Sequence, residues 1–279
     1  MCGIAAIFAY GESAPPVDRA EVIRMREQMF ARGPDGEGEW FSDDGRVGLG
    51  HRRLTIIDLS PAGAQPMWNA DRSLAIIFNG EIYNYRELRS QLSGYQFRSH
   101  CDTEVLLALY ETRGEAMLNE LRGMYAFVIW DKREQRLFLA RDPFGIKPLY
   151  YSDNGNTFRV ASQVKPLRDC GKIDLAPDPA GHVGTFYGDT FLIPILCSAT
   201  FVACPPAAQC GWIVTARARR ASSVISARFS ATRRMRKIVA TALRAVPAKN
   251  ASHRDAATKG VSARPSPRPF AIISSPMFR

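Results

Sequence analysis

The sequence predicts an α+β fold in which sheets are covered by helices. Two observations lead to this prediction. Short apolar runs bounded by turn residues recur through residues 1–184, as is typical of strands. A few stretches between these runs have the polarity and capping residues of helices,. Many strands with helices between them favour a layered arrangement.

The strands are expected in order at residues 2–9, 54–57, 74–78, 124–130, 137–140, 149–151 and 158–161. A polar turn at 131–136 predicts a hairpin. Helices are expected from the cap Asp18 to about Ala31, at 85–92, and at 105–110 with Asp102 as the N-cap,. Asn79 and Gly80 follow a strand, which predicts a sharp turn there.

Charge divides the chain into two parts. Residues 1–184 contain 22 Lys and Arg against 25 Asp and Glu, a net charge of −3. Residues 185–279 contain 15 against 2, a net charge of +13. The second part has no Glu, and its residues 214–279 are rich in Ala, Arg, Ser and Pro and sustain neither a helical nor a strand period. The two parts therefore need separate interpretations.

Several classes of protein are disfavoured by what the sequence lacks. No run approaches 18 apolar residues, so no membrane span is expected,. The apolar start is short and has no basic segment before it, which makes it a poor secretory signal,. The six cysteines form no CxxC pair and have no histidines at zinc spacing,. We expect a cytoplasmic protein without a metal site.

The position of Cys2 suggests chemistry. If Met1 is removed, one residue carries both a thiol and a free α-amine. The α-amine has a pKa of about 8 and can accept the proton of a thiol whose pKa is about 8.5. Cys2 could therefore act as nucleophile and base together. The alternative is a small buried hydrophobic residue near a terminus.

Seven motifs carry a resemblance to a known family. In order they are MCGI, RGPDGEG, GHRRLTIIDLSPAGAQPM, FNGEIYNYREL, DTEVLLALY, GMYAFVIWD and ARDPFGIKPLYY. Together they resemble the N-terminal glutaminase domain of glutamine-hydrolysing asparagine synthetases, a class II glutamine amidotransferase domain. The resemblance covers about residues 1–184. It implies an N-terminal-nucleophile hydrolase fold, a four-layer αββα sandwich, here followed by a disordered basic tail.

The resemblance also implies catalytic roles. Cys2 would attack the side-chain amide of L-glutamine and form a thioester, releasing ammonia. The Asn79 side chain and the Gly80 backbone N–H would bind the substrate and form the oxyanion hole, a type of site whose donors are each worth roughly 10²–10³-fold in rate. The residues alone leave another interpretation open, an ordinary Asn-Gly turn.

Four further residues would bind glutamine. Arg53 and the backbone around Ile57 would hold the α-carboxylate, since a guanidinium can donate two parallel hydrogen bonds. Glu81 and Asp102 would hold the α-ammonium. From the residues alone, Arg53 could be a surface arginine and Asp102 a helix cap.

The second half of an asparagine synthetase is missing from the sequence. The family's pyrophosphate loop, SGG-x-DS, does not occur. No cofactor is therefore expected in this chain, because ATP and Mg would bind the synthetase domain that is absent. The implied partners are L-glutamine and a separate synthetase domain or chain that uses the ammonia to amidate aspartate.

Residues 185–279 remain to be explained. We interpret them as the product of out-of-frame translation, which suits their Ala/Arg/Ser/Pro richness; a genuine basic tail is the alternative,. Residues 1–184 would then be a glutaminase domain that is incomplete at its end. Two other functions stay open: an inactive remnant, or a nucleic-acid binder that acts through the tail, although no nucleic-acid-binding module is recognised. We expect neither a membrane nor a nucleic acid as partner.

Overall fold

The computed structural model describes residues 1–170, 202–203 and 211–215. All of them belong to one compact unit, Met1–Arg236. The unit Lys237–Arg279 lies outside the described residues. No described helix has the length and apolar character needed to cross a membrane.

The described residues form eleven strands, four α-helices and three 3₁₀-helices. The helices are α1 (Arg19–Glu27), α2 (Tyr85–Gln91), α3 (Asp102–Arg113), α4 (Val164–Arg168), η1 (Phe30–Arg32), η2 (Pro61–Gly63) and η3 (Gly114–Asn119). The strands are β1 (Gly3–Ala9), β2 (Gly36–Phe41), β3 (Val47–Arg53), β4 (Met67–Trp68), β5 (Leu74–Ile82), β6 (Gly123–Asp131), β7 (Arg136–Arg141), β8 (Tyr150–Asp153), β9 (Thr157–Ala161), β10 (Val202–Ala203) and β11 (Gly211–Thr215).

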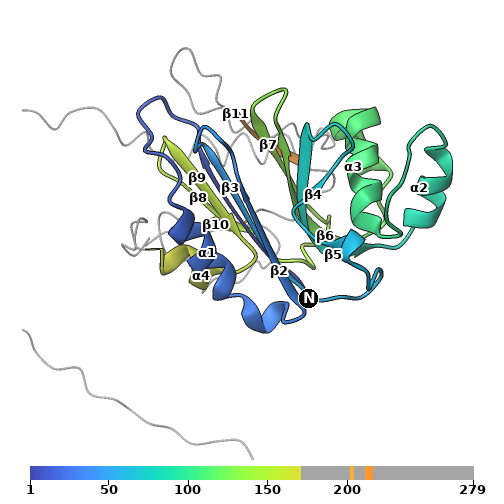
Figure 1. Ribbon diagram of the computed structural model, residues 1–279, viewed down its shortest axis with the longest axis horizontal. Helices are drawn as coiled ribbons and strands as arrows, with labels where there is room; N and C mark the ends of the chain where they lie inside the picture. Colours follow the sequence, from blue (N-terminus) through green and yellow to red (C-terminus); the bar gives the residue numbers. More distant parts are fainter. Residues whose placement is uncertain (171–201, 204–210, 216–279) are drawn as a thin grey trace, which may run out of the picture. The chain divides into compact units, whose positions relative to one another are not determined.

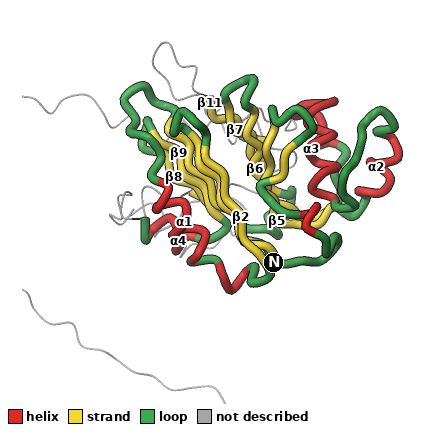
Figure 2. The backbone as a smooth tube through the Cα atoms, viewed as in Figure 1, coloured by secondary structure: helices red, strands yellow, loops and turns green. Residues whose placement is uncertain are grey.

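The strands form two sheets that pack face to face, with helices on both outer faces (Figures 1 and 2). One sheet has the order β10-β8-β9-β1-β3-β2 and the other β11-β7-β6-β5-β4. Every pairing between the named strands is antiparallel. This is the expected αββα sandwich.

Three apolar cores separate the four layers. Helices α1 and α4 pack on the outer face of the first sheet around Val22, Met25 and Leu167. Ile4, Phe8, Ile77 and Trp130 belong to the core between the two sheets. A third core joins the outer face of the second sheet to α2 and α3. Alternate residues of β1 and β5 therefore face different layers, as the period of a strand requires.

Most of the predicted elements are confirmed. Asp18 caps α1, its carboxylate accepting the Ala20 N–H at 2.9 Å, although α1 ends at Glu27 and the chain continues into η1. The hairpin is confirmed as β6 and β7, which pair from Asp131↔Arg136 onward.

Three local predictions are wrong. Residues 54–57 are a loop, and the strand, β3, lies before them. The glycines and charged residues of β3 carry no β signal. It is a strand because it pairs on both edges, with β1 and β2. Asn79 and Gly80 do not turn, because β5 continues its pairing with β6 to Ile82. Cys101, not Asp102, is the N-cap of α3.

The expected basic tail lies mostly outside the described residues. Two short stretches of it are strands. Strand β10 pairs with β8 at an edge of the first sheet, and β11 pairs with β7 in a register from Gly211↔Ala140 to Thr215↔Arg136.

Candidate active site

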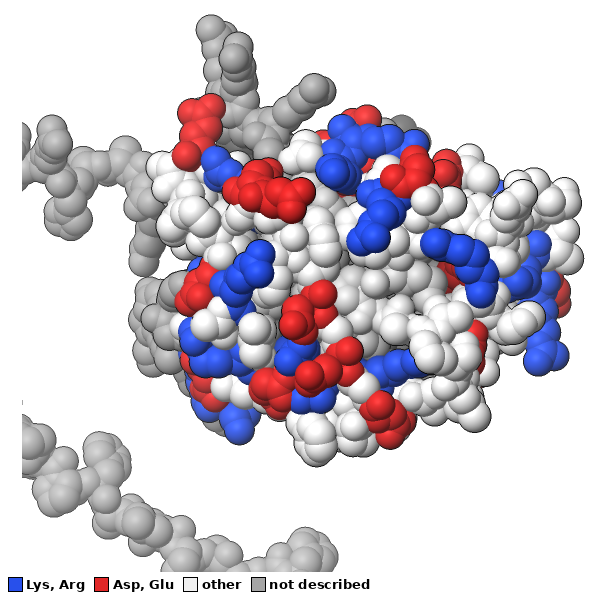
Figure 3. Space-filling model, in the orientation of Figure 1, with Lys and Arg blue, Asp and Glu red and all other residues white. Residues whose placement is uncertain are grey.

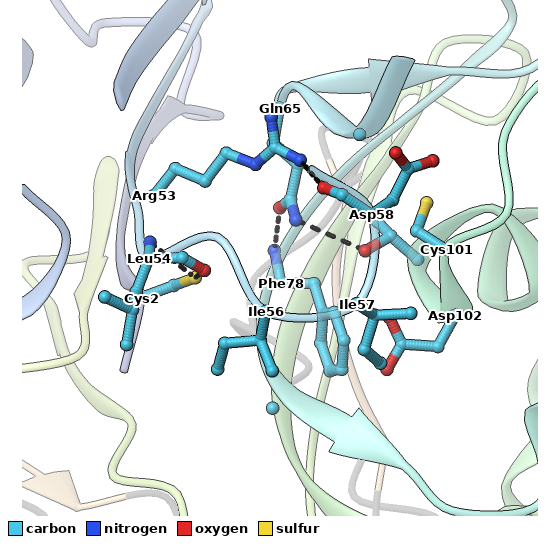
Figure 4. A pocket seen from close by; sticks show the side chains of 13 residues that line it. Cys2, Arg53, Leu54, Ile56, Ile57, Asp58, Gln65, Phe78, Cys101 and Asp102 are labelled. Carbon is cyan, nitrogen blue, oxygen red and sulfur yellow. Dashed lines mark hydrogen bonds between the residues drawn. The ribbon is translucent and has the colours of Figure 1, made fainter. Parts of the chain in front are cut away.

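A pocket opens beside the first residues of β1 (Figure 4). Its empty volume, including the open mouth, is about 440 Å³. Its wall comes from the start of β1, the loop after β3, strand β5 and the start of α3. Five of the predicted site residues line it: Cys2, Arg53, Ile57, Gly80 and Asp102.

Cys2 lies on one side of this pocket, against Leu54 (Figure 4). The Leu54 N–H donates to the sulfur at 3.4 Å, and the thiol can donate to the Leu54 carbonyl at 3.6 Å. Burial raises the pKa of the Cys2 thiol, while the Leu54 contact, the terminal amine and Arg53 lower it. Arg32 holds the backbone, its Nε donating to the Cys2 carbonyl at 2.9 Å.

Strand β5 has a largely uncovered edge at the pocket. Its other edge pairs with β6 over its whole length, from Leu74↔Asp131 to Ile82↔Gly123. Strand β4 pairs with the pocket-side edge only at Ala75 and Ile76, and the Asn69 N–H donates to the Leu74 carbonyl beside them. The backbone groups of the following residues on this side must therefore find other partners or face the pocket.

Side chains accept two of the N–H groups on this edge. The Phe78 N–H donates to Oε1 of Gln65 at 2.6 Å, and the Ile82 N–H donates to Oδ2 of Asp102 at 3.0 Å. Because alternate residues of an antiparallel strand direct their N–H groups to the same edge, the Gly80 N–H points the same way between them. Gly80 also lines the pocket. This N–H is thus directed where a substrate carbonyl oxygen can accept it.

Asn79 projects from the opposite face of β5. Phe78 packs in the core beneath α3, whereas Ala75 and Ile77 face the core between the sheets. By alternation, the Asn79 side chain enters the layer between the sheets, the side that Ile4 of β1 also faces,. Asn79 is 1% exposed, and both atoms of its amide lack a hydrogen-bond partner among the described residues. It is not among the residues that line the pocket.

Asp102 stands on the far side of the pocket from Cys2 (Figure 4). Burial raises the pKa of its carboxyl to about 6, and the charge of Glu81 adds to this rise. The N–H of Ile82 has the opposite effect. Glu81 itself is half-buried on β5 and does not line the pocket. The carboxylate of Asp102 lines the pocket and makes this side of it suited to a cation.

Arg53 holds the loop that follows β3. Its guanidinium donates to the Asp58 carbonyl and, at 3.0 Å, to the Ser60 carbonyl. The Asp58 carboxylate in turn accepts the His100 N–H at 3.1 Å. Ile56 and Ile57 of this loop line the pocket, and Ile56 is 62% exposed. The arginine therefore orders the loop as well as facing the pocket.

Two buried residues near the site were missed by sequence reasoning. Gln65 lines the pocket and is 8% exposed. His51 is fully buried, and its Nε2 lies 3.2 Å from the Phe78 carbonyl. A usable signal was that both residues belong to the motif GHRRLTIIDLSPAGAQPM, which also carries the predicted site residues Arg53 and Ile57. Buried polar groups need hydrogen-bond partners, so polar residues in such a motif are candidates for contacts within the site.

The surface around these elements carries mixed charge. Acidic and basic side chains are intermingled on the face of the described part drawn in Figure 3. One example lies between α1 and β2, where the buried guanidinium of Arg26 pairs with the exposed carboxylates of Glu27, Glu37 and Glu39. The excess positive charge of residues 185–279 falls mostly outside the described residues.

Comparison with known proteins identifies the family. Residues 1–194 match the model of a family described as "Glutamine amidotransferase domain", which is more than two thirds of the chain. The chain belongs to this family. Its class II glutamine amidotransferase domain is homologous to the glutaminase domain of asparagine synthetases, as the motifs predicted.

Curated relatives of the chain include asparagine synthetases and an amidase. This glutamine amidotransferase domain is 48% identical over 170 residues to asparagine synthetase [glutamine-hydrolyzing] 1 of Bacillus subtilis, covering 60% of this chain and 26% of that one. It is 41% identical to amidase chry2 of Gibberella zeae, covering 59% and 26%. For asparagine synthetase B of Escherichia coli the identity is 39%, covering 60% and 30%. The chain spans about a quarter to a third of the length of these relatives.

Solved structures support the fold. A glutamine phosphoribosylpyrophosphate amidotransferase from B. subtilis, complexed with ADP and GMP, has a TM-score of 0.52 at 24% identity, covering 61% of this chain and 44% of that chain. An allosteric regulatory enzyme of purine biosynthesis has a TM-score of 0.55 at 21% identity, covering 77% and 47%. Both likenesses confirm the amidotransferase-type N-terminal-nucleophile fold.

Proposed function

We propose that residues 1–184 hydrolyse L-glutamine to glutamate and ammonia through a thioester on Cys2. The observation that carries this proposal is the uncovered edge of β5. It directs the Gly80 N–H towards the pocket that Cys2 lines. The neighbouring Asn79 amide, on the face of β5 towards β1, is buried and has no hydrogen-bond partner among the described residues. Unpaired donors beside a nucleophile suit a developing oxyanion.

The chemistry requires Met1 to be removed, so that the α-amine belongs to Cys2. This amine takes the thiol proton, and the sulfur forms a bond to the side-chain carbonyl carbon of glutamine. Negative charge then develops on the carbonyl oxygen, where Gly80 and Asn79 donate. The carbon–nitrogen bond breaks and ammonia leaves with the proton. Water hydrolyses the thioester to glutamate and restores the thiol.

The other end of the pocket suits the amino-acid part of glutamine. Arg53 and the backbone near Ile57 would hold the α-carboxylate, and Asp102 with Glu81 the α-ammonium. In support, Arg53, Ile57 and Asp102 line the same pocket as Cys2. Opposite charges at one end orient the substrate so that its amide reaches the thiol.

We further propose that a synthetase domain or separate chain consumes the ammonia in ATP-dependent amidation of aspartate. ATP and Mg would bind there, and hydrolysis of glutamine needs no cofactor. In support, Ile56 lines the pocket and is 62% exposed, and large apolar side chains are also exposed at Leu59 after β3, Tyr83 after β5, and Phe144 and Ile146 after β7. Exposed apolar surface beside a site is typical of a contact with another domain or chain. The thiols of Cys2 and Cys101 form no disulfide within the described part of the chain, which suits a cytoplasmic location,.

The test is glutamate release from glutamine by the purified chain, after mass spectrometry has established loss of Met1. We expect activity that Cys2→Ala reduces at least ~10³-fold, because the nucleophile is lost. Rapid acid quench followed by mass spectrometry should trap a glutamyl thioester as a mass increase of about 129 Da on the peptide that contains Cys2. Such an adduct would support the thioester directly. A Met1-free chain that releases no glutamate would contradict the proposal and favour an inactive remnant.

A further inference from the structure

Gln65 connects two walls of the candidate site (Figure 4). Its Oε1 accepts the Phe78 N–H of β5 at 2.6 Å, and its Nε2 donates to Oγ1 of Thr103 at 3.3 Å. Phe78 directly precedes Asn79, and Thr103 directly follows Asp102. The side-chain amide of Gln65 thus spans from β5, beside Asn79 and Gly80, to the start of α3, beside Asp102.

The Gln65 side-chain amide pairs with β5 where a longer β4 would have done so. The register of β4 and β5, Met67↔Ile76, would set Gln65 opposite Phe78 if β4 continued. It does not continue, because β4 begins at Met67. The Gln65 side chain instead accepts the Phe78 N–H, and so the edge stays open at the next N–H on that side, Gly80. A continued β4 would have placed backbone against the Gly80 N–H.

The position of Gln65 is itself closely determined. Its carbonyl oxygen would lie 2.0 Å from a Cβ at Gly38. Only glycine permits such an approach, so the RGPDGEG motif supports this residue from the other sheet. Gln65 is 8% exposed, and a buried side chain with both ends of its amide bonded has little freedom.

We propose that Gln65 is a positioning residue of the glutaminase reaction. Its bond to Phe78 fixes the direction of the Gly80 N–H, and its bond to Thr103 fixes Asp102 at the other end of the pocket. This inference rests on the proposed function. It predicts that the two bonds affect different kinetic constants. The Phe78 bond acts on kcat, because oxyanion donors act in the transition state, and the Thr103 bond acts on KM, because Asp102 binds the ground state as well.

The test compares three variants of the full, Met1-free chain. Gln65→Met keeps the length of the side chain but makes neither bond, and we expect kcat to fall roughly 10- to 100-fold with a raised KM. Thr103→Val removes only the acceptor of Nε2, and we expect a raised KM with kcat within about threefold of wild type. Gln96→Met, an exposed glutamine outside the site, is the matched control for the substitution itself.

A second measurement separates positioning from a general loss of structure. Alkylation of Cys2 by iodoacetamide forms no oxyanion, so Gln65→Met should leave its rate within about twofold of wild type while glutamine hydrolysis falls. Equal losses in both reactions would overturn the proposal, as would an unchanged kcat in Gln65→Met. A wild-type chain that alkylates normally but does not hydrolyse glutamine would instead overturn the proposed function, and the role of Gln65 with it.

Discussion

Asp102 and Ile82 are joined by a hydrogen bond of 3.0 Å, in which the Ile82 N–H of β5 donates to a carboxylate oxygen of Asp102. The bond ties the end of β5 to the first turn of α3. It also uses only part of the capacity of the carboxylate, which can accept further hydrogen bonds. Asp102 can therefore hold the strand and bind a substrate cation together.

The pKa of Asp102 predicts a pH dependence of glutamine binding. Burial raises it to about 6, so the carboxylate is ionised above that pH and protonated below it. The protonated form lacks the charge that attracts an α-ammonium. We therefore expect KM for glutamine to rise about tenfold for each pH unit below about 6.

The measurement is KM against pH from 5 to 8, with the matched variant Asp102→Asn. This variant removes the titrating group, so its KM should be high and independent of pH in this range. A wild-type KM that stays constant down to pH 5 would show that Asp102 does not bind the ammonium.

Asn79 should show opposite effects on activity and stability. Its amide is buried without partners among the described residues, and leaving buried polar groups unsatisfied costs about 1–3 kcal/mol. Asn79→Leu has a similar volume and removes that cost. We expect the free energy of unfolding to rise by about 1 kcal/mol while kcat falls roughly 10²–10³-fold.

Asn69 is the matched control for that change. It is also fully buried, but its Oδ1 accepts the N–H groups of Ser73 and Leu74 at 3.0 and 2.9 Å. Asn69→Leu should therefore lower the free energy of unfolding by about 1–3 kcal/mol. Urea unfolding measures the free energy of unfolding of both variants. Equal destabilisation of the two would contradict the prediction that the Asn79 amide is unsatisfied in the folded protein.

Gly80 should tolerate no side chain. A Cβ there would lie 2.3 Å from the Met124 carbonyl oxygen of β6, and backbone cannot move aside without disturbing the sheet. We expect Gly80→Ala to lose at least ~10²-fold in kcat, because its N–H is displaced. Gly94→Ala, where a Cβ meets nothing within 4 Å, should retain wild-type activity in the same glutamate-release assay.

His51 predicts a loss of stability in acid. Burial lowers the pKa of its ring to about 4, whereas an unfolded histidine titrates near 6.5. As pH falls, the unfolded state therefore binds this proton at a higher pH than the folded state does. The stabilisation due to neutral His51 is complete above pH 6.5 and is lost as pH falls towards 4, by roughly 3 kcal/mol in all.

Urea unfolding at pH 7, 5.5 and 4 measures this loss. His51→Gln is the matched variant, since its amide can still donate to the Phe78 carbonyl that His51 Nε2 contacts and it does not titrate. The variant should lose less stability than wild type between pH 6.5 and 4. The prediction fails if the two proteins have parallel pH profiles.

Much of the fold was predictable from local sequence. The polar turn between two apolar runs predicted the β6–β7 hairpin, and Asp18 predicted the start of α1. Strand β3 could not be found this way. Its residues, VGLGHRR, have low β propensity,, and it is a strand because β1 and β2 pair with it from both sides.

The candidate site was likewise only partly predictable from local sequence. Its motifs placed five predicted residues in one pocket, because nucleophile, cation and carboxylates each have a recognisable chemistry. The sequence predicted a turn at Asn79–Gly80 and a cap at Asp102, and both were wrong. The β5 strand remains extended because β6 pairs with it, and Asp102 turns towards Ile82 because that N–H has no strand beside it.

The sequence by itself thus determined the family, the layered α+β class and the chemical types of the site residues. Those follow from residue identity, order and spacing along the chain. Only the tertiary structure decided which edge of β5 stays open, that Gln65 spans the pocket and that the buried Asn79 amide finds no partner in the part of the chain that the structure describes. These properties depend on hydrogen bonds between residues far apart in sequence, and local propensity does not encode such partners.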